Sequence, residues 1–248
     1  MKSDAIKAFI IHLDRATDRR GQVEKLIAEL PIPAEIIDAV DGRRLGQAEI
    51  ERVYRRHLHK PPYPFRLSIN EIACFLSHRK AWQAIVDQNL AAGLVIEDDV
   101  ALNSDFADAW NAARAYLEPS QFIRLPFRPG KETGPERFRK EGTRIIEPIP
   151  VGLGMVAQLV GRDAAKQLLA VTKQFDRPVD TLMQMSWVTG VNPLSVHPGG
   201  VEEVSAHLGG STLKQKRSVM HRLSREILRP IYRMRIRSLS RKHGKRPA

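Results

Sequence analysis

Three consecutive carboxylates, Glu97, Asp98 and Asp99, directly follow the apolar run Gly-Leu-Val-Ile at residues 93–96. A short continuous apolar run of this kind is typical of a strand that is buried on both faces. Because an unpaired carboxylate is costly to bury, we expect the cluster at the carboxyl end of that strand, where open α/β sheets place their ligand crevice. Carboxylate oxygens suit Mg²⁺ or Mn²⁺, which often share a nucleotide's phosphates. The alternative interpretation is a solvated acidic turn.

A second polar group follows the first apolar run of the chain, residues 7–12. Asp14, Arg15 and Arg19 come soon after it, and arginine can contact a phosphate through two parallel hydrogen bonds. If both apolar runs are strands of one sheet, these side chains would face the same crevice as the acids. On the alternative interpretation, the charges belong to the solvated first turn of a helix.

Ser77 and His78 are of the types that form a nucleophile and its base. No G-x-S-x-G turn surrounds Ser77, and adjacent residues of a helix do not face one another, so a serine hydrolase is excluded. Cys74 lies among apolar residues at helical spacing and is expected in the core rather than as a catalytic thiol. As the single cysteine, it also excludes a disulfide framework within the chain and a zinc site of paired thiolates.

The elements that must position these residues alternate between strands and helices. Apolar runs predict strands over residues 7–12, 35–40, 93–96, 122–125, 145–149 and 155–160, and helical spacing predicts helices near 23–30, 47–56, 68–89, 103–117 and 163–173. Ser68 followed by Glu71 is a capping box. Residues 127–143 are polar and predict a long excursion or a hairpin. The pattern predicts one α/β domain with a mostly parallel sheet flanked by helices.

The net charge of +12 comes from the end of the chain, because residues 212–248 contain 13 of the 40 bases and a single acid, Glu226. The remainder is neutral, which argues against a fold built to hold a nucleic-acid backbone. Within this tail, Leu223, Ile227, Ile231 and neighbouring apolar residues recur every three or four positions among arginines. The tail therefore predicts a basic amphipathic helix suited to an anionic membrane surface. A second interpretation, compatible with the first, is a helix that packs on the domain with its charges solvated.

Three ordered blocks give the sequence a resemblance to glycosyltransferase family 25. The blocks are residues 10–19, with Leu13-Asp14-Arg15 and Arg19, then Glu71-Ile72-Ala73-Cys74-Phe75-Leu76-Ser77-His78, and Ile96-Glu97-Asp98-Asp99-Val100. Pro178-Val179-Asp180 is similar to a later block of the family. The resemblance spans about residues 6–212. The family includes bacterial lipopolysaccharide and lipooligosaccharide galactosyl- and glucosyltransferases and domains of collagen galactosyltransferases.

The resemblance implies a GT-A-like domain over residues 1–212, followed by the basic amphipathic tail over residues 213–248. It implies transfer of galactose or glucose from a UDP-sugar to a lipid-linked, lipopolysaccharide-type or other glycan acceptor, with inversion and with Mn²⁺ or Mg²⁺. The single cysteine and the lack of a signal-peptide or membrane-spanning run predict a cytoplasmic enzyme. The tail predicts attachment to the inner face of the membrane.

The resemblance also implies roles for individual residues. Asp180 is the candidate base that deprotonates the acceptor hydroxyl. Metal contacts are assigned to Glu97, Asp99 and His197, and nucleotide-sugar contacts to Leu13, Asp14, Arg15, Arg19, Ser77, His78, Glu97 and Asp98. Gln158, where the family often has an aromatic residue, and Gly209-Gly210, where an acid is expected, depart from the family pattern.

Two other classes of function stay open at the sequence level. Adjacent acids also suit a metal-dependent phosphoryl-transfer enzyme or nuclease. A nucleic-acid-binding protein could use the basic tail, although the neutral body and the lack of aromatic residues interleaved in the tail count against it. A catalytically inactive family member is a further alternative.

Overall fold

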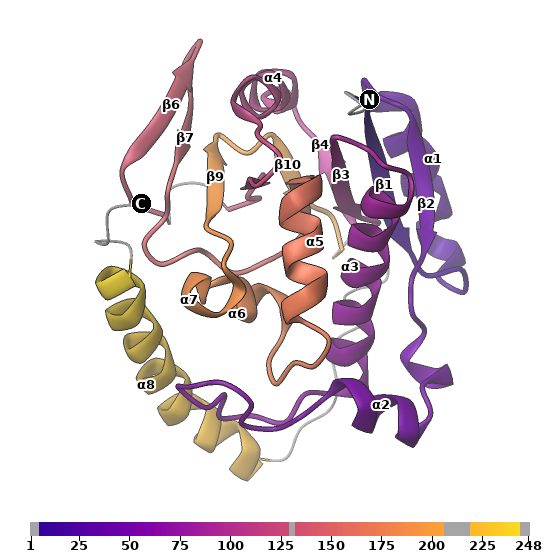
Figure 1. Cartoon of the computed structure of the whole chain (residues 1–248). Coiled ribbons are helices and arrows are strands. Elements are labelled where there is room, and N and C mark those ends of the chain that lie inside the picture. Colours follow the sequence, from indigo (N-terminus) through magenta and orange to yellow (C-terminus); the bar gives the residue numbers. More distant parts are fainter. Residues whose placement is uncertain (1–4, 129–131, 206–218, 244–248) are drawn as a thin grey trace.

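The computed structural model describes residues 5–128, 132–205 and 219–243, with side chains of the last segment described from Glu226 onward. An eight-stranded sheet with the order β2-β1-β3-β8-β5-β9-β7-β6 lies at its centre (Figure 1). The strands are β1 (Ile6–His12), β2 (Ala34–Asp38), β3 (Ala92–Glu97), β5 (Phe122–Arg124), β6 (Glu136–Lys140), β7 (Thr143–Ile146), β8 (Ala157–Gly161) and β9 (Pro193–His197). The short strands β4 (Val100–Leu102) and β10 (Val201–Glu203) pair separately.

Helices connect these strands and cover both faces of the sheet. They are α1 (Arg20–Glu29), α2 (Gln47–Val53), α3 (Ile69–Asp87), α4 (Phe106–Tyr116), α5 (Arg162–Val171), α6 (Val179–Met183), α7 (Ser186–Thr189) and α8 (Val219–His243). Within the described residues, no helix is both long enough and apolar enough to cross a bilayer.

The expectation of a mostly parallel sheet is wrong, because the sheet is mixed. The pairs β1–β2, β1–β3 and β5–β9 are parallel, whereas β3–β8, β5–β8, β7–β9 and β6–β7 are antiparallel. Parallel neighbours need a long crossover connection, usually a helix. The described residues between β5 and β8 contain a hairpin and loops but no helix. Strand β8 therefore enters between β3 and β5 in the opposite direction.

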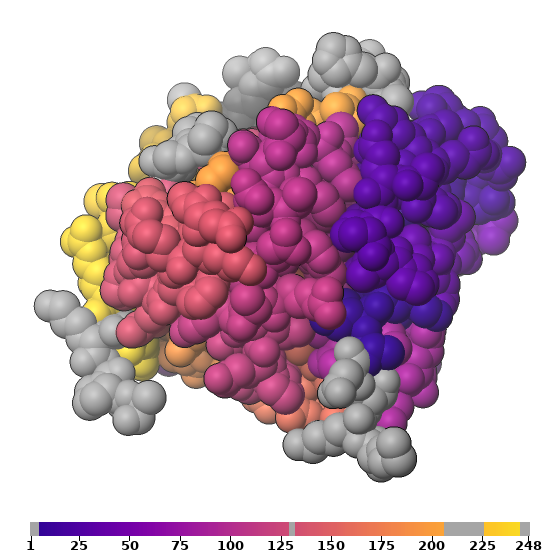
Figure 2. All heavy atoms as spheres, turned by 90° about the horizontal axis from the view of Figure 1, so that it is seen from above, coloured from indigo at the N-terminus to yellow at the C-terminus, as the bar shows by residue number. Residues whose placement is uncertain are grey.

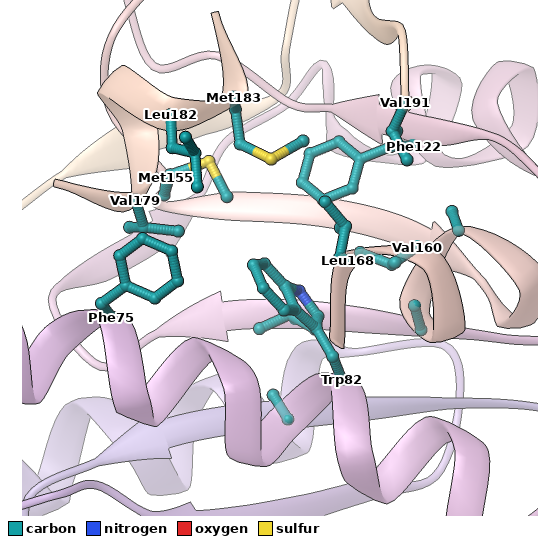
Figure 3. Close-up of a cluster of buried hydrophobic side chains, with 14 of the residues drawn as sticks. Phe75, Trp82, Phe122, Met155, Val160, Leu168, Val179, Leu182, Met183 and Val191 are labelled. Atoms are coloured by element: carbon teal, nitrogen blue, oxygen red, sulfur yellow. The ribbon is translucent and has the colours of Figure 1, made fainter. Parts of the chain in front are cut away.

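Alternating side chains of the inner strands build one core on each face of the sheet. On β1, Phe9 and Ile11 belong to a cluster with α3 and α5, whereas Ala8 and Ile10 belong to a cluster with α1 and α4. Figure 3 shows the first core, with the rings of α3 facing side chains of β5, β8, α5 and α6. The central strand β3 is buried on both faces as expected, so polar groups are confined to its end.

Helix α3 begins as its sequence predicts. Ser68 Oγ accepts a hydrogen bond from the Glu71 backbone N–H at 3.2 Å, and Glu71 Oε2 accepts one from the Ser68 N–H at 2.7 Å. This reciprocal pair satisfies two amide groups that the first turn leaves without helical partners. With its start held in this way, α3 packs Phe75 and Trp82 into the core and places Cys74 and His78 beside the end of β3.

The polar segment after β5 forms a hairpin, as one of the two sequence alternatives predicts. Strands β6 and β7 pair across a turn at Glu141-Gly142, where both residues have positive φ. Phe138 of β6 stacks on Tyr116 of α4, with ring centroids 5.2 Å apart. Figure 2 shows α4 between the N-terminal segment and this hairpin. Strand β6 of this hairpin is thus the edge strand on that side of the sheet.

Helix α8 lies along the domain, beside the loop that follows α2 (Figure 1). Its Tyr232 and Ile236 are buried members of the first core. Arg177, which is fully buried, donates to Tyr232 Oη at 2.6 Å. Part of the tail therefore packs on the domain, as one of its two interpretations predicts. This packing is compatible with the other interpretation, in which the helix also lies on a membrane surface. The proposed boundary at 212/213 and the side chain of Leu223 lie outside the described residues.

Arg177 holds three segments together. It binds both carboxylate oxygens of Asp176, at 2.7 and 2.9 Å, and donates to the carbonyls of His59 and Pro61 in the loop after α2. A buried charge that loses its partners is strongly destabilising. The position of α8 therefore depends on this cluster as well as on apolar packing.

Replacing Tyr232 by Phe should destabilise the protein by about 1–3 kcal/mol, because it leaves a donor of the buried Arg177 without its partner. Chemical denaturation measures the loss, and hydrogen exchange should show faster opening of residues 226–243. Tyr116→Phe is the matched control, since its hydroxyl has no hydrogen-bond partner among the described residues; that variant should stay within about 0.5 kcal/mol of the wild type. Equal effects of the two substitutions would contradict the anchoring role of Tyr232.

Candidate active site

The acidic cluster lies where two parallel strands end. Strands β1 and β3 pair in parallel with Ile11 opposite Glu97, so the residues that follow both strands meet at one edge of the sheet. Asp98 and Asp99 follow in the turn before β4. The acids are therefore at the carboxyl end of a buried strand, as the sequence predicts.

Asp98 is buried and its two carboxylate oxygens are both engaged. Oδ2 lies 2.7 Å from His12 Nδ1, and Oδ1 accepts a hydrogen bond from Arg19 Nη1 at 2.5 Å. All three side chains are nearly inaccessible. Asp98 and Arg19 were both expected to contact a nucleotide, but here they bind each other. Their role in this structure is to join the ends of β1 and β3 to the start of α1.

Asp99 is less well compensated. Its Oδ2 lies 3.2 Å from Arg19 Nη1. Burial, followed by the negative charge of Glu97, raises the pKa of Asp99 to about 7, although Arg19 opposes this shift. Near neutral pH the carboxyl group is thus poised between its protonated and charged forms. A cation nearby would favour the charged form.

Glu97 is the acid that contacts helix α3. Its Oε1 lies 3.1 Å from His78 Nε2 and 4.0 Å from Cys74 Sγ. On the other side of the imidazole, the amide Nε2 of the fully buried Gln158 lies 3.3 Å from His78 Nδ1. With the amide assigned in this orientation, Nδ1 accepts a hydrogen bond from Gln158 Nε2–H, and His78 Nε2–H donates one to Glu97. Gln158, from β8, therefore orients the histidine toward the acid.

The donor atoms of Cys74, His78 and Glu97 lie within 4.8 Å of one another, which makes them a candidate metal group among the described residues. Carboxylate and imidazole both suit a divalent ion such as Mn²⁺. Burial, with a further contribution from Glu97, raises the pKa of the Cys74 thiol well above its usual value. A protonated thiol is a poor ligand, because thiolates bind metals. The donor set therefore fits a cation held mainly by Glu97, with Asp99 two residues further along the chain.

His197 is not brought to this group. Its Nε2 lies 3.4 Å from Glu132 Oε2, and Glu132 also pairs with the buried Arg124. Hydrogen bonding to His197 and the positive charge of Arg124 lower the pKa of Glu132 to about 2 despite its burial. His197 lines neither of the two cavities described below. The structure thus places it in a buried ion-pair cluster, and we do not keep it as a metal ligand.

The first cavity opens beside the acids and encloses about 760 Å³, including solvent at its mouth. Among its lining residues are most of the expected nucleotide contacts and all three acids, namely Leu13, Arg15, Arg19, Ser77, His78, Glu97, Asp98 and Asp99. Asp14 is the exception, since it is exposed and pairs with Arg20 at 3.0 Å.

Two polar side chains shape the wall of the first cavity. Ser77 Oγ donates to the Ala73 carbonyl at 2.8 Å and accepts from the Val40 N–H at 2.9 Å. It therefore supports the backbone after β2, and among the described residues no base contacts it as a nucleophile would require. Arg15 donates through Nε to Asp41 Oδ2 at 2.9 Å, an arrangement that holds its guanidinium at the cavity.

A second, larger cavity of about 1340 Å³ meets the first at Cys74 and Glu97, which line both. Asp180 lies in its wall. The Gly154 N–H donates to Asp180 Oδ2 and the Thr181 hydroxyl to Asp180 Oδ1, each at 3.1 Å. Gly154 has φ +96°, and a Cβ there would lie 2.8 Å from the Phe127 ring, so glycine is required at this position. Glu97 thus stands between a cavity with basic and acidic groups and one that contains a candidate base.

Sequence reasoning did not assign a site role to Gln158, Arg229 or Arg233, although the structure places Gln158 against His78 and the two arginines in the second cavity. Gln158 was visible only as a departure from the family pattern. Arg229 and Arg233 are four residues apart, but this spacing does not show what the helix packs against. These roles depend on contacts between distant segments.

Curated proteins similar to this chain include collagen-modifying enzymes and an inactive relative. Procollagen galactosyltransferase 2 of Homo sapiens is 38% identical over 101 residues, covering 40% of this chain and 16% of that protein. Procollagen galactosyltransferase 1 of Danio rerio is 40% identical over 97 residues, covering 38% and 16%. The inactive glycosyltransferase 25 family member 3 of Homo sapiens is 38% identical over 103 residues, covering 40% and 17%. The matched segment spans about a sixth of these relatives.

Among solved structures, a mutant of Drosophila β-1,4-galactosyltransferase 7, in complex with manganese, UDP-Gal and xylobiose, is 12% identical to this chain. The comparison covers 89% of this chain and 79% of that one, with a TM-score of 0.39. A likeness of this strength does not by itself establish a shared fold.

The family assignment rests instead on a match over most of the chain. The family model described as glycosyltransferase family 25 (LPS biosynthesis protein) matches residues 5–183. This range includes both strands that end at the acidic cluster, helix α3, Gln158 and Asp180. The chain therefore belongs to glycosyltransferase family 25.

Proposed function

We propose that this protein transfers galactose or glucose from a UDP-sugar to a hydroxyl group of a glycan acceptor, with inversion at the sugar carbon. The position of Glu97 between two cavities carries this proposal. One cavity has the charged groups that a metal-bound nucleotide diphosphate would contact, and the other contains Asp180. Family membership and the galactosyltransferase names of two relatives support galactose as the first sugar to test.

The first cavity is the proposed donor site. Arg15 and the backbone after β1 would contact the UDP moiety, and Asp98 would hold Arg19 in place rather than bind the donor. Glu97 and Asp99, with His78 beside them, would hold Mn²⁺ or Mg²⁺. When bound, such a cation stabilises the negative charge of the departing diphosphate. This arrangement is GT-A-like in its use of acids at a strand end.

The second cavity is the proposed acceptor site, with Asp180 as the base. In the transfer step, the acceptor oxygen forms a bond to the anomeric carbon while the bond from that carbon to the diphosphate oxygen breaks. Asp180 takes the hydroxyl proton, and UDP leaves. The bonds from Gly154 and Thr181 fix its carboxylate and leave lone pairs for the acceptor.

We further propose that residues 1–212 form the catalytic unit and that α8, within residues 213–248, also rests on an anionic membrane surface. Helix α8 has four exposed apolar residues, with Ile227 59%, Leu228 39%, Ile231 38% and Met234 63% exposed. Arg235 and Arg241 are exposed on the same helix. Apolar residues flanked by bases favour the interface of an anionic bilayer, where a lipid-linked acceptor would also lie.

Asp99→Asn should weaken Mn²⁺-dependent binding of UDP by about tenfold or more, because it removes a charged ligand of the proposed cation. Calorimetry with and without Mn²⁺ measures this effect, and binding of UDP without metal should stay unchanged. Asp105→Asn is the control, since Asp105 is exposed and lines neither cavity. Undiminished metal dependence in Asp99→Asn would exclude this role. Cleavage of RNA or DNA by the wild type would instead favour the phosphoryl-transfer alternative.

Asp180→Asn should lower kcat by about 100-fold or more and leave the Kd of UDP within twofold, because only proton removal from the acceptor is lost. Release of UDP from UDP-galactose or UDP-glucose in the presence of acceptor measures turnover. Asp163→Asn, on the exposed side of α5, is the control for loss of a carboxylate. Retained turnover in Asp180→Asn would mean that another group is the base.

Ile231→Glu should reduce binding to vesicles that contain phosphatidylglycerol by about tenfold, because it places a charge in the proposed membrane-facing surface. Sedimentation with vesicles measures binding at low and high salt. Ile36→Glu is the control, since Ile36 is 48% exposed on the edge strand β2. If both variants bind vesicles as the wild type does, α8 has no such role.

A further inference from the structure

We propose that the second cavity binds a glycan acceptor that carries an anionic group, a phosphate or a carboxylate, and that Arg229 and Arg233 of α8 hold this group. The inference deepens the proposed function, because it names the chemical class of the acceptor. It also makes α8 a wall of the acceptor site in addition to a surface helix.

Three arginines form a stripe along α8. Arg229, Arg233 and Arg237 recur every four residues, so they lie on one side of the helix. Arg229 and Arg233 line the second cavity, and Arg233 and Arg237 line an adjoining cavity that shares Leu153 and Gln184 with it. The stripe therefore runs from the cavity of Asp180 toward its neighbour. Ile227 and Ile231, two of the exposed apolar residues proposed to meet a membrane, line neither of these cavities, whereas Met234 lines the adjoining one.

The three side chains of this stripe form no hydrogen bond or ion pair with any residue that the structure describes. Like charges four residues apart destabilise a helix. Unlike the buried Arg177 and Arg124, which pair with Asp176 and Glu132, the three arginines of the stripe are exposed and line the open side of the two cavities. A stripe of three bases that the protein itself does not neutralise is an arrangement that an anionic ligand would compensate.

The bases and the candidate catalytic acid face the same space. Tyr63 lies in the wall of this cavity. Burial, and then nearby acids that include Asp180, raise the pKa of Tyr63, whereas the charge of Arg229 lowers it. Tyr63 is therefore close to both Asp180 and Arg229. The Tyr63 ring contacts the Tyr232 ring edge to face, with centroids 5.4 Å apart, and lies 5.5 Å from Phe65 in the same way. The cavity thus has acids, an aromatic wall and bases.

Each of these parts matches one part of an anionic sugar. An aromatic wall packs against the apolar face of a sugar ring. Arginine binds phosphate or carboxylate through parallel hydrogen bonds, which fixes orientation as well as adding attraction. With its anionic group at the arginines, the sugar would present a hydroxyl toward Asp180. A neutral sugar would lack the orienting contact.

The test compares glucose 6-phosphate, glucuronic acid and glucose as ligands of the full-length protein, with binding measured by calorimetry in the presence of Mn²⁺ and UDP. We expect the charged sugars to bind at least about tenfold more tightly than glucose. Arg229→Gln/Arg233→Gln should remove most of this preference, whereas Arg235→Gln/Arg241→Gln, which loses the same charge elsewhere on α8, should retain it. Circular dichroism and the Kd of UDP check that each variant is folded with an intact donor site.

Three results would overturn the inference: no preference for charged sugars in the wild type, a preference that survives Arg229→Gln/Arg233→Gln, or equal loss in both double variants. If the glutamine pair does not fold, Arg229→Lys/Arg233→Lys takes its place and should bind glucose 6-phosphate more weakly, because lysine lacks the planar fork. If Arg229→Gln/Arg233→Gln lost binding to phosphatidylglycerol vesicles but kept the preference for charged sugars, the stripe would be assigned to lipid headgroups. That result would also overturn the inference. If the wild type did not bind UDP, that result would count against the proposed function. Calorimetry would still show whether the charged sugars bind more tightly than glucose.

Discussion

Three adjacent carboxylates at the end of a strand buried on both faces are the constraint on which the rest of this structure depends. Such charges must be paired or placed at the edge of the sheet. Arg19 and His12 bind Asp98, and His78 contacts Glu97. Because those partners come from three segments, compensation of the acids also fixes how β1, α1 and α3 meet. Asp99 shares Arg19 with Asp98, and burial together with the charge of Glu97 raises its pKa to about 7.

A second buried charge, Arg177, organises the opposite side of the site. It joins Asp176, the loop after α2 and Tyr232 of α8. Since Asp180 follows closely in α6, the same cluster that anchors α8 also sets the distance between that helix and the candidate base. The second cavity is therefore formed by segments that are far apart in the chain, and its shape depends on one arginine with several partners.

The sequence predicted much of the local structure. The capping box at Ser68 and Glu71, the buried strand before Glu97 and the hairpin after β5 are all present, because each depends on neighbouring residues or on short periodic patterns. The prediction of a mostly parallel sheet is wrong, because the direction of β8 depends on how the chain returns from β7. The placement of His197 beside Glu132 likewise depends on the path of β9, which no local pattern encodes.

By itself, the sequence determined the family, the position of the acids at a strand end and the amphipathic character of the last helix, because motif spacing and periodicity carry this information. Only the tertiary structure decided which acid is compensated, that Gln158 orients His78, and which arginines of α8 reach the second cavity. The physical reason is that compensation of a buried charge, tautomer choice and cavity shape all depend on contacts between residues distant in sequence. In this protein those contacts separate a structural acid from a candidate metal ligand.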